Sequence, residues 1–306
     1  DGCGMTGSIV VVFTVTDQSG NSAQTTASFT IIDSTGPTLT MGASNQVVEC
    51  DGSGNIDALN AWLTSHGGAN ASDMCGMVTW SHDFTGLSNS CGETGTAVVN
   101  FTATDECGNA ITTNASFTIS DTQAPSWINI PVNESEECDG SGNLVGLNAW
   151  LSSFTAGDIC GSASVTHSFV QMVEACGATG SMVYNFIATD ACGNSNTCAQ
   201  TIVVDDSVAP IISCPMDVTI QCSGSTDPMS TGNATASDNC DILPLVTFSD
   251  VTAGGTCPQG IAITRTWVAT DDCGNSSSCV QSILLDDTLP SRSMDCTHEL
   301  EFPQSS

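Results

Sequence analysis

The sequence contains no lysine and only two arginines, Arg265 and Arg292, against 33 acidic residues, so its net charge is -31. Phosphates of nucleic acids and anionic lipids repel a polyanion of this density, which excludes nucleic acid as a partner and argues against membrane binding or insertion. The absence of lysine also excludes isopeptide cross-links between lysine and asparagine. Covalent reinforcement must therefore come from cystine. The acidity itself indicates a soluble, self-repelling surface that attracts cations.

Aromatic residues are also scarce, at 5% of the chain, whereas Gly, Ser and Thr are abundant. This composition favours short β-strands joined by tight turns over helical bundles. No stretch reaches the roughly 18 to 20 apolar residues of a membrane-spanning helix. The chain starts within a strand pattern and not with a signal peptide, so we expect a mature piece. Its 17 cysteines indicate disulfides, and hence a secreted, extracellular or cell-surface protein.

An internal repeat is the most informative feature that is present. The phrase Thr-Asp-x-x-Gly-Asn recurs with its aspartate at Asp17, Asp105, Asp190 and Asp271, a spacing that matches one small β-sandwich. Each copy lies between two strands of alternating polarity, and a proline follows the second strand. We therefore predict an all-β protein of tandem immunoglobulin-like β-sandwich modules.

The prolines at 37, 125, 210 and 290 set the expected module boundaries. We name the resulting parts module 1 (1–37), module 2 (38–125), module 3 (126–210), module 4 (211–290) and the tail (291–306). Module 1 holds only the last half of a repeat, and the tail resembles the opening of another. Modules 2 and 3 each carry an insert with helical spacing, at Leu59, Trp62 and Leu63 and at Leu147, Trp150 and Leu151. We expect a short helix there, with its tryptophan as a buried anchor; the alternative is that the tryptophan stacks against a sugar.

Module 4 resembles a known family. It carries CPMDVTIQC from Cys214, TASDNCD from Thr235 and TRTWVATDDCGNSSSC from Thr264, and it closes with DDTLP. Together these motifs resemble the HYR (hyalin repeat) domain in its cysteine-rich bacterial form. Modules 2 and 3 share only part of the pattern and resemble other repeats of tandem bacterial surface proteins. The resemblance implies an immunoglobulin-like sandwich used in adhesion or as a stalk, and no catalytic residue.

Four classes of cysteine recur in modules 2 to 4, as Cys50, Cys75, Cys91 and Cys107, then Cys138, Cys160, Cys176 and Cys192, then Cys222, Cys240, Cys257 and Cys273. Four cysteines allow three connectivities. Module 1 keeps Cys3 of the Cys91 class but has Ser19 in place of the Cys107 class, which argues that those two classes are not partners. We therefore predict bonds within modules, Cys50 with Cys91 and Cys75 with Cys107, and likewise in modules 3 and 4. Cys214 and Cys279 suit a further bond in module 4.

Cys3, Cys198 and Cys296 remain outside this scheme. The incomplete module 1 and the tail suggest that the tail of one subunit completes module 1 of the next by strand addition, with a Cys3 to Cys296 disulfide. The equal alternative is that the sequence is part of a longer array, so the partners are copies of itself or neighbouring modules. Both alternatives describe a filament or stalk.

Carboxylates near the module ends are the candidate ligands for an ion. They are Asp105 with Asp121, Asp190 with Asp205 and Asp206, and Asp271 with Asp286 and Asp287. Hard oxygen ligands of this kind could hold Ca²⁺. A turn-forming role for the aspartate of Thr-Asp-x-x-Gly-Asn is the alternative. The DGSGN runs at Asp51 and Asp139 lack the terminal glutamate of a calcium loop, and we expect glycine-rich turns. Otherwise we expect no cofactor.

Six sequons are candidate glycosylation sites: Asn70, Asn100, Asn114, Asn133, Asn233 and Asn275. The histidines, His66, His82, His167 and His298, have no aligned nucleophile beside them, so we expect no enzyme. Two function classes remain. The first is an extracellular structural protein of a filament or stalk. The alternative is an adhesin that binds carbohydrate or a surface protein, with the two inserts and Trp80 or Trp127 as the places to look for its binding site.

Overall fold

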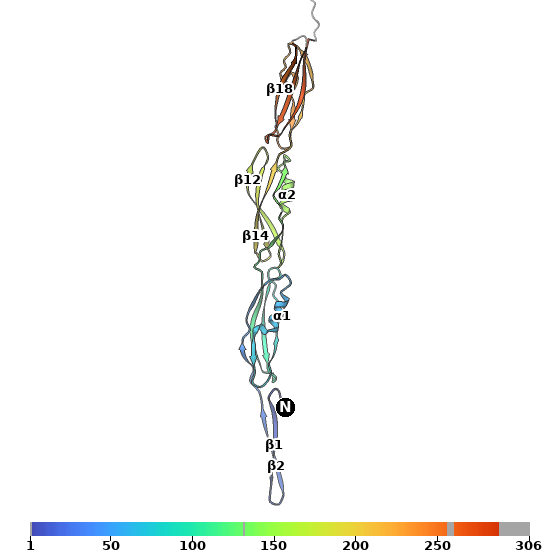
Figure 1. Ribbon diagram of the computed structural model, residues 1–306. Helices are drawn as coiled ribbons and strands as arrows, with labels where there is room; N and C mark the ends of the chain where they lie inside the picture. The colour runs from blue at the N-terminus through green and yellow to red at the C-terminus, as the bar shows by residue number, and fades with distance from the viewer. Residues whose placement is uncertain (1, 131, 256–259, 288–306) are drawn as a thin grey trace, which may run out of the picture. The chain divides into compact units, whose positions relative to one another are not determined.

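The computed structural model describes residues 2–130, 132–255 and 260–287. The chain, drawn as a ribbon in Figure 1, forms two compact units. Of the described residues, the first unit holds those up to Ile130 together with Phe154–His167 and Phe186–Cys198, and the second unit holds the others.

A long β-hairpin recurs around each Thr-Asp-x-x-Gly-Asn turn, as the alternating pattern predicts. In module 2, β7 (Gly95–Thr104) pairs antiparallel with β8 (Ala110–Ser120). The turn between them is held by Asp105, whose Oδ1 accepts the backbone N–H groups of Cys107 at 2.8 Å and Asn109 at 2.9 Å. The corresponding strands are β1 (Gly7–Thr16) and β2 (Ser22–Ile31), β13 (Gly180–Asp190) and β14 (Ser195–Asp205), and β19 (Ile261–Thr270) and β20 (Ser276–Asp286).

Three of these hairpins belong to four-stranded sheets of identical order, β4-β8-β7-β6, β10-β14-β13-β12 and β16-β20-β19-β18. The added strands are β4 (Gln46–Glu49), β6 (Thr79–His82), β10 (Glu134–Glu137), β12 (Ala163–Glu174), β16 (Val218–Gln221) and β18 (Leu245–Gly254). The first strand of each sheet runs parallel to its neighbour, whereas β7 and β19 pair antiparallel on both sides.

A two-stranded sheet accompanies each four-stranded one. These pairs are β3 (Thr38–Met41) with β5 (Asn70–Ser72), β9 (Ser126–Asn129) with β11 (Thr155–Gly157), and β15 (Ile211–Ser213) with β17 (Thr235–Ser237). The predicted class, tandem β-sandwich modules of the all-β kind, is confirmed.

Both predicted helices are present, as α1 (Ile56–Thr64) and α2 (Leu144–Ser152). Each follows a DGSGN turn whose aspartate accepts hydrogen bonds from the serine and asparagine N–H groups, so these runs are turns. Module 4 adds a four-residue helix, α3 (Pro228–Thr231), that the sequence did not predict, and a 3₁₀ turn, η1 (His66–Gly68), follows α1.

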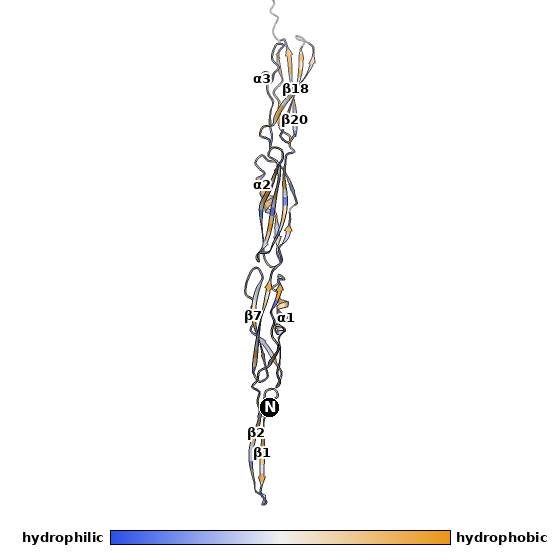
Figure 2. Ribbon diagram, turned by 90° about the vertical axis from the view of Figure 1, so that its left-hand side faces the viewer, coloured by the Kyte–Doolittle hydropathy of each residue, from blue (hydrophilic) through white to orange (hydrophobic). Residues whose placement is uncertain are grey.

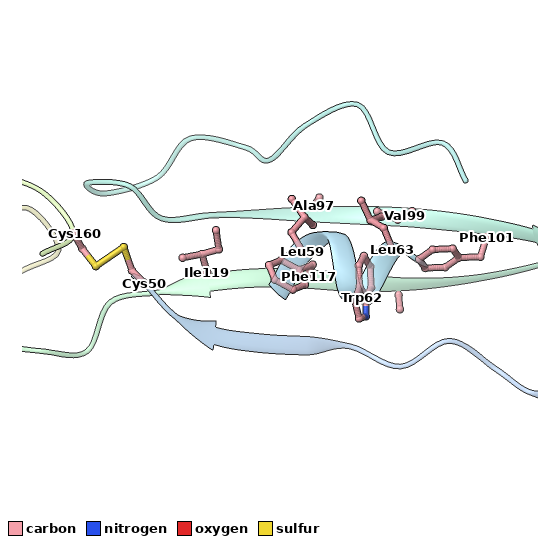
Figure 3. Packing of buried hydrophobic residues seen from close by; sticks show 11 residues of the cluster. Cys50, Leu59, Trp62, Leu63, Ala97, Val99, Phe101, Phe117, Ile119 and Cys160 are labelled. Carbon is pink, nitrogen blue, oxygen red and sulfur yellow. A yellow bond between two sulfur atoms is a disulfide. The ribbon is translucent and has the colours of Figure 1, made fainter. Parts of the chain in front are cut away.

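Helix α1 fills the core of module 2 (Figure 3). Leu59, Trp62 and Leu63 point from the helix toward Phe101 and Phe117 of the hairpin, and all five are buried. Trp62 Nε1 donates to the Ser44 carbonyl at 3.1 Å, which satisfies the one polar group of the ring. The anchoring role predicted for this tryptophan is confirmed. In α2, Trp150 is buried while its flanking leucines are half-buried.

The hairpin of module 1 differs from the others because β1 and β2 form a sheet of two strands. Among the described residues no further strand pairs with either one, and Figure 2 shows hydrophobic residues along β1. Phe13 is 56% exposed and Phe29 65%, whereas their counterparts Phe101 and Phe117 are 0% exposed. The open core expected for an incomplete module is thus present in this hairpin.

Candidate functional site at the module junctions

Disulfides join each module to the next. Cys50 of module 2 bonds to Cys160 of module 3, and Cys91 bonds to Cys192. The same two pairings recur one module later as Cys138–Cys240 and Cys176–Cys273, and Cys3–Cys107 joins module 1 to module 2. Of the six disulfides within the described ranges, five therefore cross a module boundary. Figure 3 shows the Cys50–Cys160 bond at the end of the module 2 core.

The pairs predicted within modules 2 and 3, and the pair of Cys240 with Cys273 in module 4, were wrong. Cys50 and Cys91 do lie at the same end of module 2, since Cys50 follows β4 and Cys91 precedes β7. Both, however, take their partners from module 3. A tandem repeat makes a bond within one period and a bond to the next period look alike in sequence. The observation on Cys3 was misinterpreted: module 1 has no cysteine of the Cys107 class because Cys3 bonds to Cys107 of module 2, so the two classes are partners across the boundary.

The remaining cysteines divide into three groups. Cys214 bonds to Cys279 within module 4, as the sequence had suggested. Cys75 and Cys198 are free, half-buried thiols.

The predicted Cys3 to Cys296 bond was wrong, because Cys3 bonds to Cys107 in its own chain. Cys222 is disulfide-bonded, but its predicted partner Cys257 lies outside the described residues, as do Cys296 and the rest of the tail.

Backbone contacts hold the bonded loops together. Glu93, in the loop of Cys91, donates its N–H to the carbonyl of Cys160 at 2.9 Å. Gly92 has φ of 56°, and a Cβ there would lie 2.2 Å from the same carbonyl oxygen. Only glycine fits both the left-handed backbone and the close approach. The Cys-Gly-x-Thr-Gly sequence of this loop is therefore a docking element for the next module.

Aspartates gather beside these disulfides. Oxygens of Asp206, Asp238 and Asp271 lie within 4.8 Å of one another, and Asp121 and Asp158 form a similar group with Cys160. At the first junction Asp33 groups with Asp105 and Cys107 and with Asp73 and Cys75. In each group one aspartate closes a module, and the others belong to the next module. A cavity of about 340 Å³ adjoins the group of Asp121, Asp158 and Cys160, and Glu49 also lines it.

Like charge and burial perturb these carboxylates. Burial raises the pKa of Asp206, and the neighbouring charges of Asp238 and Asp271 raise it further. Asp121 shows the same shift, with burial as the largest cause and Asp158 and Asp190 as contributors. Burial also acts to raise the pKa of Asp190, but hydrogen bonds from Asn194 and Cys192 outweigh it and lower that pKa. The junction carboxylates are therefore crowded.

The group in module 4 has two buried oxygens without a hydrogen-bond partner, Oδ2 of Asp238 and Oδ2 of Asp271. In module 3, Asn194 Nδ2 donates to Oδ2 of Asp190 at 2.9 Å. Asn194 Nδ2 also donates to the carbonyl of Asp121 at 3.2 Å, and its counterpart Asn275 keeps this second bond, to the carbonyl of Asp206 at 3.0 Å, but does not bond to Oδ2 of Asp271. Because buried carboxylate oxygens are normally paired or bound to a metal, this group has the donor set of a hard-cation site.

The predicted grouping of the calcium candidates was wrong. Asp105 and Asp121 lie at opposite ends of β8, and the full strands β14 and β20 likewise separate Asp190 from Asp206 and Asp271 from Asp287. Each turn aspartate instead faces the closing aspartate of the preceding module. Four members of these groups, Asp33, Asp73, Asp158 and Asp238, were not predicted from the sequence, although three of them lie in the recurring Asp-x-Cys phrase (Asp73, Asp158, Asp238), which was a usable signal.

The other predicted residues are dispersed. Five sequon asparagines are exposed, and Asn275 is half-buried at a junction. Trp80 and Trp127 are half-buried; Trp80 stacks on His66 at 4.7 Å, and Trp127 meets Phe154 edge-on at 6.4 Å. His82 and His167 lie on exposed strand positions, and His298 is outside the described residues.

No helix in the ranges that the structure describes is both long and apolar enough to cross a bilayer.

No protein-family model matches the sequence, and neither does any characterised protein compared with it. Among solved structures, the chain is similar to the PcdhgB3 EC1-4 fragment, at 12% identity and a TM-score of 0.34, covering 94% of this chain and 84% of that one. It is also similar to the protocadherin gammaB7 EC3-6 cis-dimer structure, at 11% identity and a TM-score of 0.33, covering 91% and 85%. Extracellular cadherin domains 1-5 of protocadherin gamma B2 match at 12% identity and a TM-score of 0.32, covering 94% and 67%.

Proposed function

We propose that this chain is an extracellular structural protein, a segment or subunit of a filament or stalk whose adjacent modules are covalently joined. The observation that carries the proposal is the set of five disulfides between adjacent modules. A bond within a module stabilises that module alone. A bond between modules also restrains the junction. The HYR-like motifs of module 4 and the tandem repeat support the same reading, and disulfides in this number require an oxidising, extracellular setting.

The order of the bonds gives the chain a short covalent path under tension. Force enters at Cys3, crosses to Cys107, follows residues 91–107 back to Cys91 and crosses to Cys192. It then follows residues 176–192 and crosses from Cys176 to Cys273. Each of the two segments is at most about 55 Å long when fully extended. More than half of each is already extended in the fold, as β7 and β13.

Unfolding under force therefore releases little length while these bonds are intact. The reduced chain from Cys3 to Cys273 could extend to about 900 Å, and the bonded path to only about 110 Å. The work that a given force does on unfolding is the force multiplied by the length gained. Because the length gained is small, tension favours unfolding of the modules only weakly. Such a chain transmits force with little lengthening, which is the property that a stalk or filament needs.

Single-molecule pulling of the full chain, held by tags at its two ends, tests this proposal. We expect a gain in contour length between Cys3 and Cys273 that stays below about 110 Å without reductant and reaches several hundred ångströms with it. The C214S/C279S variant is the matched control, because it removes a bond within module 4 and leaves the path intact. Equal extension with and without reductant would exclude the proposed role.

We also propose that the junction groups bind Ca²⁺. The three carboxylates of Asp206, Asp238 and Asp271 offer the oxygen ligands that Ca²⁺ prefers, and two of the oxygens are buried without a partner. A bound cation would neutralise the charge that crowds this junction. It would hold the aspartate that closes module 3 against two aspartates of module 4.

Self-association remains part of the proposal, since the hairpin of module 1 exposes its core face. Adhesion is the alternative function. Trp80 and Trp127, two of its suggested binding positions, pack against His66 and Phe154. Negative-stain imaging separates the two functions: regular fibres support the structural role, and discrete particles that bind glycans support adhesion.

A further inference from the structure

One face of the β1–β2 hairpin is apolar and open. We define the hairpin face as the side chains of Ile9, Val11, Phe13, Val15, Phe29 and Ile31, which are 41% to 69% exposed. Their counterparts in module 2 are Ala97, Val99, Phe101, Ala103, Phe117 and Ile119, which are 0% to 7% exposed. The same sequence pattern is thus a core in module 2 and a free surface in module 1.

The complete modules show what covers such a face. In module 2, β4 pairs in parallel with the second hairpin strand, with Gln46 opposite Phe117 and Glu49 opposite Ser120. Helix α1 follows and packs on the buried residues. In module 4, β16 pairs with β20 in the same direction. Among the described residues, β2 pairs only with β1, so the position that β4 and β16 occupy beside their hairpins is open in module 1.

Cys75 lies where a strand paired with β2 would end. Its counterparts Cys160 and Cys240 bond to Cys50 and Cys138, and each of these partners comes directly after a covering strand, β4 or β10. The Cys75 carbonyl accepts the N–H of Met5 at 2.8 Å, just as the Cys160 carbonyl accepts that of Glu93. The loop of Cys75 is therefore docked like the loop of Cys160, yet its thiol is free.

Ser34 supplies a third element of recognition. Its counterparts Thr122 and Ser207 donate their N–H and hydroxyl groups to the glutamate that ends the covering strand, Glu49 or Glu137. Ser34 occupies the same place after the closing aspartate of module 1 and is exposed. A glutamate directly before the bonding cysteine would thus find its two donors on Ser34.

We propose that the hairpin face binds the front half of a module of this same repeat type, supplied by another stretch of polypeptide. Its strand runs parallel to β2, its terminal glutamate meets Ser34, and the cysteine that follows forms a disulfide with Cys75. The inference rests on the proposed structural function and names the partner of its open end. The preference for this partner comes from three matched features: the apolar face, the two donors of Ser34 and the free thiol.

Disulfide trapping on the full chain tests this inference. The probe is a peptide of residues 42–50, GASNQVVEC, whose cysteine is activated as a mixed disulfide with thiopyridine. The Cys75 thiolate attacks the probe sulfur, the new bond forms, and pyridinethione leaves with the electron pair. Burial and the charges of Asp33 and Asp73 raise the pKa of Cys75, so the reaction is run above neutral pH. Mass spectrometry of a digest reports labelling at each cysteine.

Cys198 is the matched control, because it is a free, half-buried thiol of the same chain. We expect the probe to label Cys75 at least about 10-fold faster than a scrambled peptide with the same terminal cysteine, because binding raises the effective concentration of the thiol. Both peptides should label Cys198 equally. The F13D variant, altered at an exposed position, should lose the preference at Cys75.

Equal rates at Cys75 for the two peptides, or a preference that survives F13D, would overturn the inference. Disulfide-linked dimers through Cys75 in the absence of probe would mean that a second copy covers the face in another way, and would also overturn it. None of these outcomes changes the bonds between modules, so failure here is distinct from failure of the proposed function.

Discussion

Cys91, which precedes β7, is bonded to Cys192, which follows β13 in the next module. Cys176 and Cys273 repeat the relationship one module later. Each hairpin strand of this kind thus has a cystine at both ends that leads into a neighbouring module. A strand is the backbone conformation closest to full extension, so force follows a path that has almost no slack.

Removing the Cys91–Cys192 bond should lengthen this path. In the C91S/C192S variant the shortest covalent route from Cys3 to Cys273 runs through residues 107–138 and 240–273 instead, which roughly doubles the accessible extension. We also expect a loss of about 2–4 kcal/mol of stability, because the bond closes a long loop. Pulling and thermal unfolding measure the two effects. The C214S/C279S variant should show no longer path, and equal extension of both variants would contradict the account.

Calcium should stabilise the junction between modules 3 and 4. We expect Ca²⁺ to raise the unfolding temperature of the chain and EDTA to lower it, since a bound ion stabilises the folded state by mass action. The D271N variant keeps the turn but removes a charge of the group, and it should abolish most of this response. D139N, in the turn before α2, is the control. Differential scanning calorimetry that shows no response to either addition would exclude these sites.

The pKa of Asp206 should be measurable and sensitive to calcium. Because the folded-state pKa is raised, the folded chain binds more protons than the unfolded chain, and this group reduces stability as the pH rises from the unfolded pKa through the folded pKa. Asp139 has a lowered pKa through hydrogen bonds from Asn143 and Ser141, and stability from this group is lost as the pH falls through its folded pKa.

Carbon-detected NMR of the carboxyl groups should therefore give a higher midpoint for Asp206 than for Asp139. Added Ca²⁺ should move only the Asp206 midpoint downward, because protons compete with the ion at that group. Identical midpoints for the two carboxylates would argue against crowding at the junction.

Arg265 should be the most sensitive charged residue of module 4. It is 1% exposed and donates from Nε and Nη2 to the two carboxylate oxygens of Asp250, both at 2.8 Å. Its guanidinium also lies 4.3 Å from the ring of Phe248. We expect R265A to destabilise module 4 by about 3 kcal/mol, because it leaves the Asp250 carboxylate and the buried Thr231 hydroxyl without the guanidinium that donates to both.

R265K keeps the charge but loses the bidentate geometry, so the stability of this variant should lie between those of the unchanged chain and R265A. Hydrogen exchange of β18 and β19 measures the local effect. M229A, at a 96% exposed position, is the control and should be neutral. An R265A variant with unchanged protection would show that the pair contributes nothing to stability.

Local pattern was enough to predict the hairpins and the two helices. The alternation around Phe101 and Phe117 and the helical spacing of Leu59, Trp62 and Leu63 are properties of single segments, and burial follows from them directly. The short helix α3 escaped prediction because four residues carry no periodicity. Its role is tertiary, since Thr231 accepts a hydrogen bond from Arg265 at 3.0 Å.

The junctions were beyond local pattern. Cys50 and Cys160 are 110 residues apart, and nothing in the repeat distinguishes that partner from Cys91 within the same module. The aspartate groups could not be predicted for the same reason, because their members come from two consecutive modules. Asp206 ends one module and Asp271 lies in the turn of the next, so their proximity follows only from the way consecutive modules meet.

The central claim is that cystines join consecutive modules, and a disulfide map of the non-reduced protein tests it most directly. Free thiols are blocked, and the chain is cut at acidic residues, because it offers only two arginines to trypsin. Mass spectrometry should find linked peptides that contain Cys50 with Cys160 and Cys91 with Cys192. Linked peptides that contain Cys50 with Cys91, or Cys75 with Cys107, would contradict the account.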